Sequence, residues 1–324
     1  MITIEKSGLF TTIQDLGRAG YQKYGVIAGG AMDPFAHRVA NILVGNEENE
    51  ATIESTMIGP TIHFNKENII SICGGNSSPA INGKPIPMWR PITVKKGDIL
   101  QTGTCVRGFR TYIAFAGGLA VPKVMNSRST FVRGKLGGYN GRALEALDEI
   151  PFGPFNNLSK QIHSSLVDVG PAKWRIPSHL VYSCNKIRVI KGRHYSLFPT
   201  KIYHEFLHNP YKISPESDRM GYRLQGSSLI LQKKNELVSE AVTFGTVQVT
   251  SDGNPVILLA DRQTTGGYPK VAQVISADFP LLAQKKPGDT IQFEEVSLEK
   301  AQQLLREREK LIAQFKRAIN LKYR

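Results

Sequence analysis

A short polar segment, residues 261–268, combines side chains that could bind a charged or amide-like ligand. It directly follows an apolar run, residues 256–260, that is typical of a strand buried on both faces. An arginine beside a carboxylate can bind a charged group or an amide, and glycine lets the backbone approach a ligand and can adopt positive φ. The alternative is a polar hairpin corner whose side chains cap their own backbone, and the residue types leave both readings open. The segment consists, in order, of Asp261, Arg262, Gln263, Thr264, Thr265, Gly266, Gly267 and Tyr268.

Three more segments show the same mixture of polar side chains and nearby glycines. Residues 11–21 follow an alternating first strand, residues 127–142 follow a second buried strand, and residues 217–224 lie in the second half of the chain. Arginine next to glycine suits a loop that binds an anion, and a mobile surface loop explains the pattern nearly as well. The candidate binding residues in these segments are Gln14, Asp15, Arg18, Arg128, Arg219 and Tyr222.

Length and composition are those of a globular protein with about two domains. The chain has 324 residues, of which 41% are hydrophobic and 21% charged, and it contains no apolar run long enough for a membrane span. The N-terminus lacks the layout of a signal peptide. Three cysteines, an odd number without metal-ligand spacing, indicate buried thiols rather than disulfides. We therefore expect a cytoplasmic protein.

The net charge of +14 does not by itself indicate a nucleic-acid-binding protein. Lysines and arginines are scattered, part of the excess lies in residues 297–324, and no basic stripe interleaved with aromatic residues is present. Solvated surface charge is the favoured interpretation. Attraction of an anionic substrate or of an acidic protein partner is the second.

Short strands separated by turns dominate the pattern, which predicts a mainly β protein with a few helices. Asp33 followed by Pro34 predicts the capped start of a helix over residues 34–43, and Asn82-Gly83 predicts a hairpin. We expect an N-terminal β-rich lobe at residues 1–165, a second β-rich lobe at 166–296 and an amphipathic helix at 297–324. Faint similarity between residues 15–21 and 261–268 fits two related lobes.

His204, Glu205 and His208 match the H-E-x-x-H pattern, in which two imidazoles one helical turn apart bind zinc. Asn209-Pro210 would end the helix directly after the second histidine, and the extended form of the motif is absent. Glu236 and Glu240 are possible third ligands, although nothing selects either. A surface helix that carries two histidines is the commoner case, so we expect no metal site.

No phosphate-binding loop, dinucleotide fingerprint or serine-nucleophile motif occurs in the sequence. A chain without a phosphate-cradling loop is not expected to hydrolyse ATP by itself. We expect this chain to bind no cofactor.

Five segments together resemble the biotin-dependent carboxyltransferase family, which is also called the allophanate hydrolase subunit 2 family. They lie in order along the chain, at residues 12–20, 30–33, 127–130, 217–224 and 261–269. Some positions differ from the family pattern. Gly29 replaces the usual serine, which removes a hydroxyl group from a glycine-rich turn.

The resemblance implies a cyclophilin-like β-barrel and a function carried out with partners. Members act beside a subunit-1-type protein, and the family includes the C subunit of bacterial 5-oxoprolinase. That complex also contains a B subunit of the subunit-1 type and a LamB/YcsF-type A subunit, and it hydrolyses 5-oxoproline to glutamate using ATP. On this interpretation the complex uses ATP, the substrate is a small molecule, and neither nucleic acid nor a membrane is a partner.

Three function classes follow from the resemblance. In a 5-oxoprolinase, Arg262, Gln263 and Asp261 would be catalytic, and Thr264, Thr265, Gly266, Gly267 and Tyr268 would bind the lactam or a phosphorylated form of it. In a urea-type carboxylase or allophanate hydrolase subunit 2, the same donors would hold biotin presented by a partner. In a binding protein, the chain would antagonise an inhibitor of a sporulation kinase through its subunit-1-type partner. The absence of a Met-Lys-Met biotin acceptor favours the first class over the second.

Overall fold

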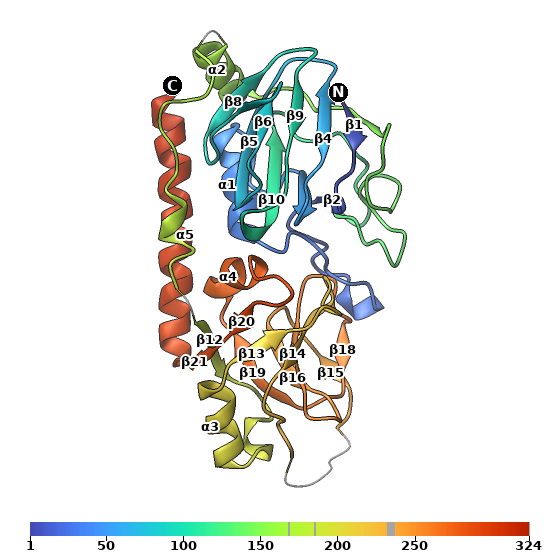
Figure 1. Ribbon diagram of the computed structural model, residues 1–324, viewed down its shortest axis with the longest axis vertical. Helices are drawn as coiled ribbons and strands as arrows, with labels where there is room; N and C mark the ends of the chain where they lie inside the picture. The colour runs from blue at the N-terminus through green and yellow to red at the C-terminus, as the bar shows by residue number, and fades with distance from the viewer. Residues whose placement is uncertain (168, 185, 232–236, 324) are drawn as a thin grey trace. The chain divides into compact units, whose positions relative to one another are not determined.

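A computed structural model describes residues 1–167, 169–184, 186–231 and 237–323 (Figure 1). Contacts divide the chain into two compact units. Unit 1 contains residues 1–18, 33–180 and 310–324, and unit 2 contains residues 19–32 and 181–309. Both units are built mainly from antiparallel strands. No helix among the described residues is both long enough and apolar enough to cross a membrane.

Two sheets form the core of unit 1. The first has the order β11-β1-β4-β9-β6-β7 and the second the order β2-β3-β10-β5-β8. Alternate residues of both sheets, such as Ile4, Ile62, Ile72 and Ile113, meet in one buried apolar cluster. The strands are β1 (Ile2–Lys6), β2 (Phe10–Gln14), β3 (Thr52–Thr56), β4 (Thr61–Phe64), β5 (Asn68–Asn76), β6 (Ala80–Ile81), β7 (Lys84–Pro85), β8 (Pro91–Val94), β9 (Ile99–Gln101), β10 (Arg107–Phe115) and β11 (Glu149–Ile150).

Helix α1 (Pro34–Leu43) lies against β5 and β10, which Figure 1 shows in the upper part of the ribbon. The predicted N-cap is confirmed, because the Asp33 carboxylate accepts a hydrogen bond from Ala36 N at 2.9 Å. The predicted hairpin at Asn82-Gly83 is also confirmed, since both residues have positive φ between β6 and β7. A second helix, α2 (Asn157–Leu166), lies against β5 and β8.

Unit 2 contains an eight-stranded sheet in the order β20-β13-β14-β17-β16-β19-β12-β21. Its two outer strands are neighbours in the sequence and are separated by one residue, so the sheet is a nearly closed barrel. This confirms the prediction of a mainly β fold with a barrel. The strands are β12 (Ile187–Lys191), β13 (Tyr211–Ile213), β14 (Gly221–Gln225), β16 (Thr246–Val249), β17 (Pro255–Leu258), β19 (Lys270–Val274), β20 (Thr290–Ile291) and β21 (Phe293–Glu295).

A small two-stranded sheet and several helices complete unit 2. This sheet pairs β15 (Glu240–Ala241) with β18 (Thr265–Gly266), two strands that are separated in the chain by β16 and β17. Helix α3 (Thr200–His208) lies against β21 and contributes Phe206 to the barrel core, and α4 (Phe279–Ala283) contributes Leu281 and Leu282. Short 3-10 turns occur at Gln22–Tyr24, Ser178–Leu180, Tyr195–Leu197 and Ser276–Asp278.

The predicted C-terminal helix is α5 (Leu298–Lys322). Ile312 and Ile319 of its apolar stripe are buried, and the Phe315 ring meets Phe35 at a centroid distance of 6.5 Å. Its residues up to 309 group with unit 2 and the later ones with unit 1. Residues 19–32 are predicted to belong to the N-terminal lobe but group with unit 2, and residues 166–180 are predicted to belong to the second lobe but group with unit 1. That the domain limits predicted at 165 and 296 separate independently folding parts stays a prediction.

Candidate functional site

The site loop, which we define as residues 261–268, begins where β17 leaves the barrel. The residues before it are apolar because they contribute to the barrel core, in which Leu259 and Ala260 are buried. The backbone N–H of Asp261 donates to the carbonyl oxygen of Arg219 at 2.9 Å. This bond joins the loop to the segment that precedes β14, so the two sequence motifs at 217–224 and 261–268 meet at the start of the loop.

Asp261 and Arg219 form a two-pronged ion pair in the interior of unit 2. Arg219 Nε donates to Asp261 Oδ2 at 2.9 Å, and Arg219 Nη2 donates to Asp261 Oδ1 at 3.1 Å. Both residues are more than 90% buried. The same Nη2 also donates to the carbonyl oxygen of Gly30 at 2.7 Å. One planar guanidinium therefore joins three segments of unit 2, a task that suits the fixed fork of arginine.

Breaking this pair is expected to destabilise unit 2 strongly, because removal of either partner would leave the charge of the other one buried and unpaired. We expect Arg219→Met and Asp261→Asn each to lower the free energy of unfolding by about 3 to 5 kcal/mol. The double variant should lose less than the sum, with a coupling energy of about 1 to 3 kcal/mol. Urea titration of the four proteins measures this coupling. Additive losses would contradict a direct pair.

Arg262 is buried and its side chain turns toward the protein backbone. Its Nε donates to Val242 O at 3.3 Å and its Nη1 to Leu259 O at 3.2 Å. Arg262 is 7% exposed, so its guanidinium does not lie at a solvent-exposed site mouth. Burial lowers the pKa of Arg262, and the neighbouring Asp261 carboxylate acts in the opposite direction. Asp261 itself forms the two-pronged ion pair with Arg219.

The polar residues after Arg262 reach the surface of unit 2. Gln263 and Thr265 are exposed and Thr264 is half-buried, so the first two offer hydrogen-bonding groups to a ligand. Tyr268 is 46% exposed, and its carbonyl oxygen accepts a bond from Gln248 Nε2 at 3.4 Å. The exposed side chains of the loop are therefore carried by a backbone that is anchored on both sides.

Gly266 and Gly267 lie in closely packed positions and do not have positive φ. Neither of them lies among the residues with positive φ, which corrects the expectation from the sequence. A Cβ atom on Gly266 would lie 2.6 Å from Gln248 Nε2, and one on Gly267 would lie 3.1 Å from the carbonyl oxygen of Leu237. A side chain at Gly266 would therefore require the amide group of Gln248 to move.

A second group of candidate residues gathers in unit 1 around Asp15, which follows β2. Its Oδ1 accepts bonds from Ser129 Oγ at 2.6 Å, Ser127 Oγ at 2.7 Å and Gly17 N at 2.8 Å. Its Oδ2 accepts a bond from Arg128 N at 2.6 Å. Burial by itself raises the pKa of Asp15, but the bonds from these donors outweigh it and lower the pKa below the ordinary value. Asp15 is thus a buried carboxylate that holds the 127–129 segment.

Gln14 and Arg18 contact the same segment and are fully buried. Gln14 Nε2 donates to Thr130 O at 3.1 Å and to Thr12 Oγ1 at 3.0 Å, while Arg18 Nη2 donates to Ser129 O. Gln14 Oε1 is buried without a hydrogen-bond partner. The sequence motifs at 12–20 and 127–130, about 110 residues apart, therefore form one structure.

Arg128 is half-buried and engaged in unit 1. Its Nε donates to Val121 O at 3.1 Å, and its Nη1 forms an ion pair with Glu50 at 3.1 Å. Its backbone N–H, rather than its guanidinium, contacts Asp15. In the structure the Arg128 guanidinium thus binds two groups of unit 1, Val121 O and the Glu50 carboxylate. A role of Arg128 in ligand binding stays a prediction.

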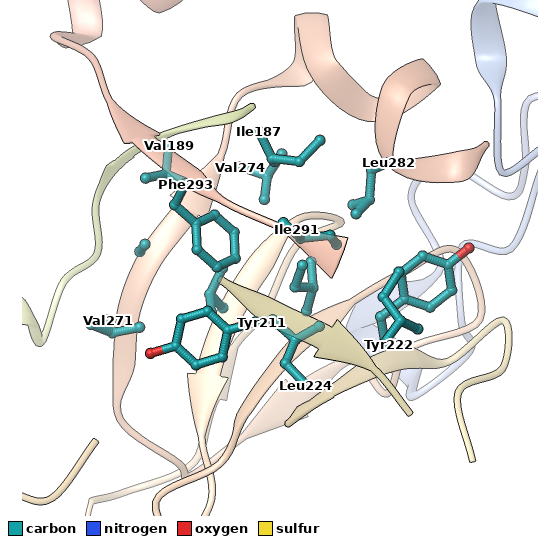
Figure 2. Packing of buried hydrophobic residues seen from close by; sticks show 14 of the residues in the cluster. Ile187, Val189, Tyr211, Tyr222, Leu224, Val271, Val274, Leu282, Ile291 and Phe293 are labelled. Atoms are coloured by element: carbon teal, nitrogen blue, oxygen red, sulfur yellow. The ribbon is translucent and has the colours of Figure 1, made fainter. Parts of the chain in front are cut away.

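Tyr222 belongs to the apolar core of the barrel (Figure 2). Its ring is 1% exposed, and its hydroxyl group donates to Lys285 O at 2.8 Å. Figure 2 shows this hydroxyl pointing away from the other labelled side chains. Tyr222 therefore packs in the barrel core from β14, the strand that pairs with β17 before the site loop.

The two histidines of the H-E-x-x-H pattern lie on α3, as predicted, with their rings stacked at 3.9 Å between centroids. His208 Nδ1 bonds to the carbonyl oxygen of His204 at 2.8 Å. Within the part of the chain that the structure describes, no group of three or more His, Cys, Asp or Glu side chains is placed to bind a metal ion. Glu236 lies outside the described residues, and Glu240 contacts Lys270 and Arg193. Of the three thiols, Cys73 and Cys105 are buried as predicted, whereas Cys184 is only partly buried.

The structure thus brings the predicted residues into two groups, one in each unit. Gln14, Asp15 and Arg18 meet the 127–130 segment in unit 1, and Arg219 meets the site loop in unit 2. Sequence reasoning missed Lys270 and considered Glu240 only as a possible metal ligand, whereas the two residues contact each other beside the site loop. The signal for Lys270 was its position directly after Tyr268-Pro269. Glu240 lies in a stretch whose sequence carries no such signal.

Comparison with known proteins shows similarity along nearly the whole chain. The family model described as "Carboxyltransferase domain, subdomain A and B" matches residues 24–295. The C subunit of 5-oxoprolinase from Haemophilus influenzae is 38% identical over 311 residues, which is 96% of each chain. The same subunit of Escherichia coli is 36% identical and covers 93% of each chain. The crystal structure of the Kluyveromyces lactis urea amidolyase superposes with a TM-score of 0.87 at 33% identity, covering 97% of this chain and 20% of that one.

Proposed function

Because the chain belongs to the family of carboxyltransferase domains with subdomains A and B, we propose that it is the C subunit of an ATP-dependent 5-oxoprolinase. The observation that carries the proposal is the similarity to two relatives of that name over 93–96% of both chains. In this function the chain assembles with a B subunit of the subunit-1 type and a LamB/YcsF-type A subunit. The complex opens the lactam of 5-oxoproline to glutamate and uses ATP.

The site loop suits the recognition of a lactam. Ring opening requires a polarised carbonyl group, and hydrogen-bond donors fixed in place before the reaction serve this purpose well. Gln263 and Thr265 carry exposed donors, and the Asp261–Arg219 pair together with Arg262 holds the backbone from which they project. We assign substrate contact to Gln263, Thr264 and Thr265. Asp261 and Arg262 set the geometry and the positive potential of the loop.

The first test is reconstitution with and without the partners. We expect the purified chain by itself to hydrolyse neither ATP nor 5-oxoproline, because its sequence has no phosphate-cradling loop. The complex with both partner proteins should form ADP and glutamate in equal amounts. Lactam-dependent ATP hydrolysis by the single chain would contradict the expectation that ATP hydrolysis requires the partner subunits. An assembled complex without activity would contradict the proposed 5-oxoprolinase function.

A urea-type carboxyltransferase is the second candidate, and the fold similarity to the urea amidolyase favours it. In that case biotin would be presented by a partner, and the site loop would bind an amide nitrogen and the carboxyl group of carboxybiotin. The same preparation distinguishes the two functions. Transfer of labelled carboxylate from carboxybiotin to urea, without turnover of 5-oxoproline, would support the carboxyltransferase.

A further inference from the structure

A cluster of charged side chains lies beside the site loop and has no part in the function described so far. It consists of Lys270 at the start of β19, Glu240 in β15, and Arg193 and His194 after β12, and we call it the Lys270 cluster. Lys270 Nζ lies 2.9 Å from Glu240 Oε1 and donates to the carbonyl oxygen of Gly266 at 3.2 Å. The ammonium group therefore contacts both strands of the small β15–β18 sheet, and β18 is part of the site loop.

The backbone of residues 240–242 runs along the site loop. Glu240 is paired with Gly266 and Ala241 with Thr265, and Val242 N donates to Thr264 O at 3.1 Å. The carbonyl oxygen of Val242 in turn accepts the bond from Arg262 Nε. Two buried cations thus fasten the loop to this strand, Arg262 near its beginning and Lys270 near its end.

His194 holds the backbone of Lys270 from the other side. His194 Nδ1 accepts a hydrogen bond from Lys270 N at 3.2 Å, and His194 N donates to Lys270 O at 3.0 Å. Burial and the nearby Lys270 lower the pKa of His194, so its ring is neutral at pH 7 and its Nδ1 can accept. Its Nε2 lies 3.8 Å from Glu240 Oε1, which places the Glu240 carboxylate between the imidazole and the ammonium.

Burying a lysine at the start of β19 costs free energy, because its ammonium group loses its hydration. Lys270 is 6% exposed, and removal of an ammonium group from water must be offset by a partner charge and hydrogen bonds. An apolar residue at the start of β19 would fill the barrel wall without this cost. What the ammonium group supplies here, and an apolar side chain cannot, is the hydrogen bond to Gly266 O, which fixes the orientation of the peptide between Gly266 and Gly267.

We propose that Lys270, held by Glu240 and His194, is a positioning residue that fixes the Gly266 peptide and with it the side chains of Gln263 and Thr265. This inference rests on the proposed function, because it takes the site loop as the place where the lactam binds. Gln248 assists from β16, since its amide donates to Tyr268 O and lies close to Gly266. Lys270 itself acts through the loop and does not contact the substrate.

The test compares Lys270→Met, which keeps the length of the side chain, with Lys270→Arg, which can restore both contacts. Lys191→Met is the matched control, because Lys191 lies on the neighbouring strand, is half exposed and pairs with Glu295 at 3.6 Å. Hydrogen exchange of the peptide that covers residues 262–269 is measured on the isolated chain. The kcat and KM for 5-oxoproline are measured on the reconstituted complex.

In Lys270→Met we expect exchange in this peptide to accelerate at least tenfold and kcat to fall at least tenfold with a smaller change in KM. Lys270→Arg should recover most of both, and Lys191→Met should match the parent protein. Parent-like exchange together with kcat within twofold of the parent in Lys270→Met would overturn the proposal. If Lys270→Met does not fold, Glu240→Gln, at a partly exposed position, removes the charge that holds Lys270 and is judged by the same outcomes. Exchange does not depend on turnover, so a failure of the proposed function is distinguishable from a failure of this inference.

Discussion

Replacing Arg262 by lysine is expected to reduce the activity of the reconstituted complex by about tenfold or more while leaving the chain folded. Lysine keeps the positive charge, but one ammonium group cannot reproduce the planar fork that reaches Val242 O and Leu259 O together. The site loop would stay attached and lose its precise geometry. Positioning errors of this kind reduce turnover far more than they reduce stability.

Arg262→Ala separates recognition from support. It leaves two buried carbonyl groups without these donors, so we expect the free energy of unfolding to fall by about 1 to 3 kcal/mol and activity to fall with it. Arg223→Lys is the control, because Arg223 belongs to the same unit and is exposed. Melting temperature and complex activity are measured on all three variants. Full activity in Arg262→Lys would end the assignment of this residue to the geometry of the site.

Local features of the fold could be predicted because they depend on neighbouring residues. The helix at Pro34–Leu43 follows from a capping aspartate and a proline, and the turn at Asn82-Gly83 follows from two residues that tolerate positive φ. The end of the buried strand before Asp261 follows from a change in composition over a few residues. Each of these predictions required only a short window of sequence.

The contacts of the candidate site could not be predicted because their partners are distant in the sequence. Asp261 is 42 residues from Arg219, and Asp15 is 112 residues from Ser127. A carboxylate next to an arginine suggests a pair between neighbours, but the side chains of Asp261 and Arg262 leave the backbone toward different partners. Which arginine neutralises a buried aspartate depends on the strand order of the barrel, and composition does not encode that order locally.

The grouping of residues into units shows the same limit. Residues 19–32 lie within an N-terminal stretch that reads as one lobe, yet they group with unit 2, where Gly30 O binds Arg219. The glycines among residues 25–30 predict a turn, but they do not indicate that this turn contacts Arg219. Two contacts hold this segment to unit 2: buried Arg219 uses Gly30 O as an acceptor, and Met32 packs in the apolar core of the barrel.

Replacing Asp15 by alanine is expected to destabilise unit 1 more than any exposed substitution. Four donors, from Gly17, Ser127, Arg128 and Ser129, would lose a buried charged acceptor. We expect the free energy of unfolding to fall by about 3 to 5 kcal/mol at pH 7. Asp15→Asn should lose part of this amount, because its amide keeps one acceptor oxygen but presents N–H groups where Asp15 Oδ2 accepts from Arg128 N.

The pH dependence identifies the charge as the cause. The pKa of Asp15 is lower in the folded chain than its ordinary value of 3.8. Its stabilisation is therefore complete above that value and is lost as the pH falls through the folded-state pKa. The difference in unfolding free energy between the parent and Asp15→Asn should be constant from pH 7 to about pH 5 and should shrink at lower pH. Urea titrations across this range measure it, with Glu67→Gln, at an exposed position of unit 1, as the matched control. A difference that stays constant down to pH 3 would show that the shape of the side chain, and not its charge, holds the 127–129 segment in place.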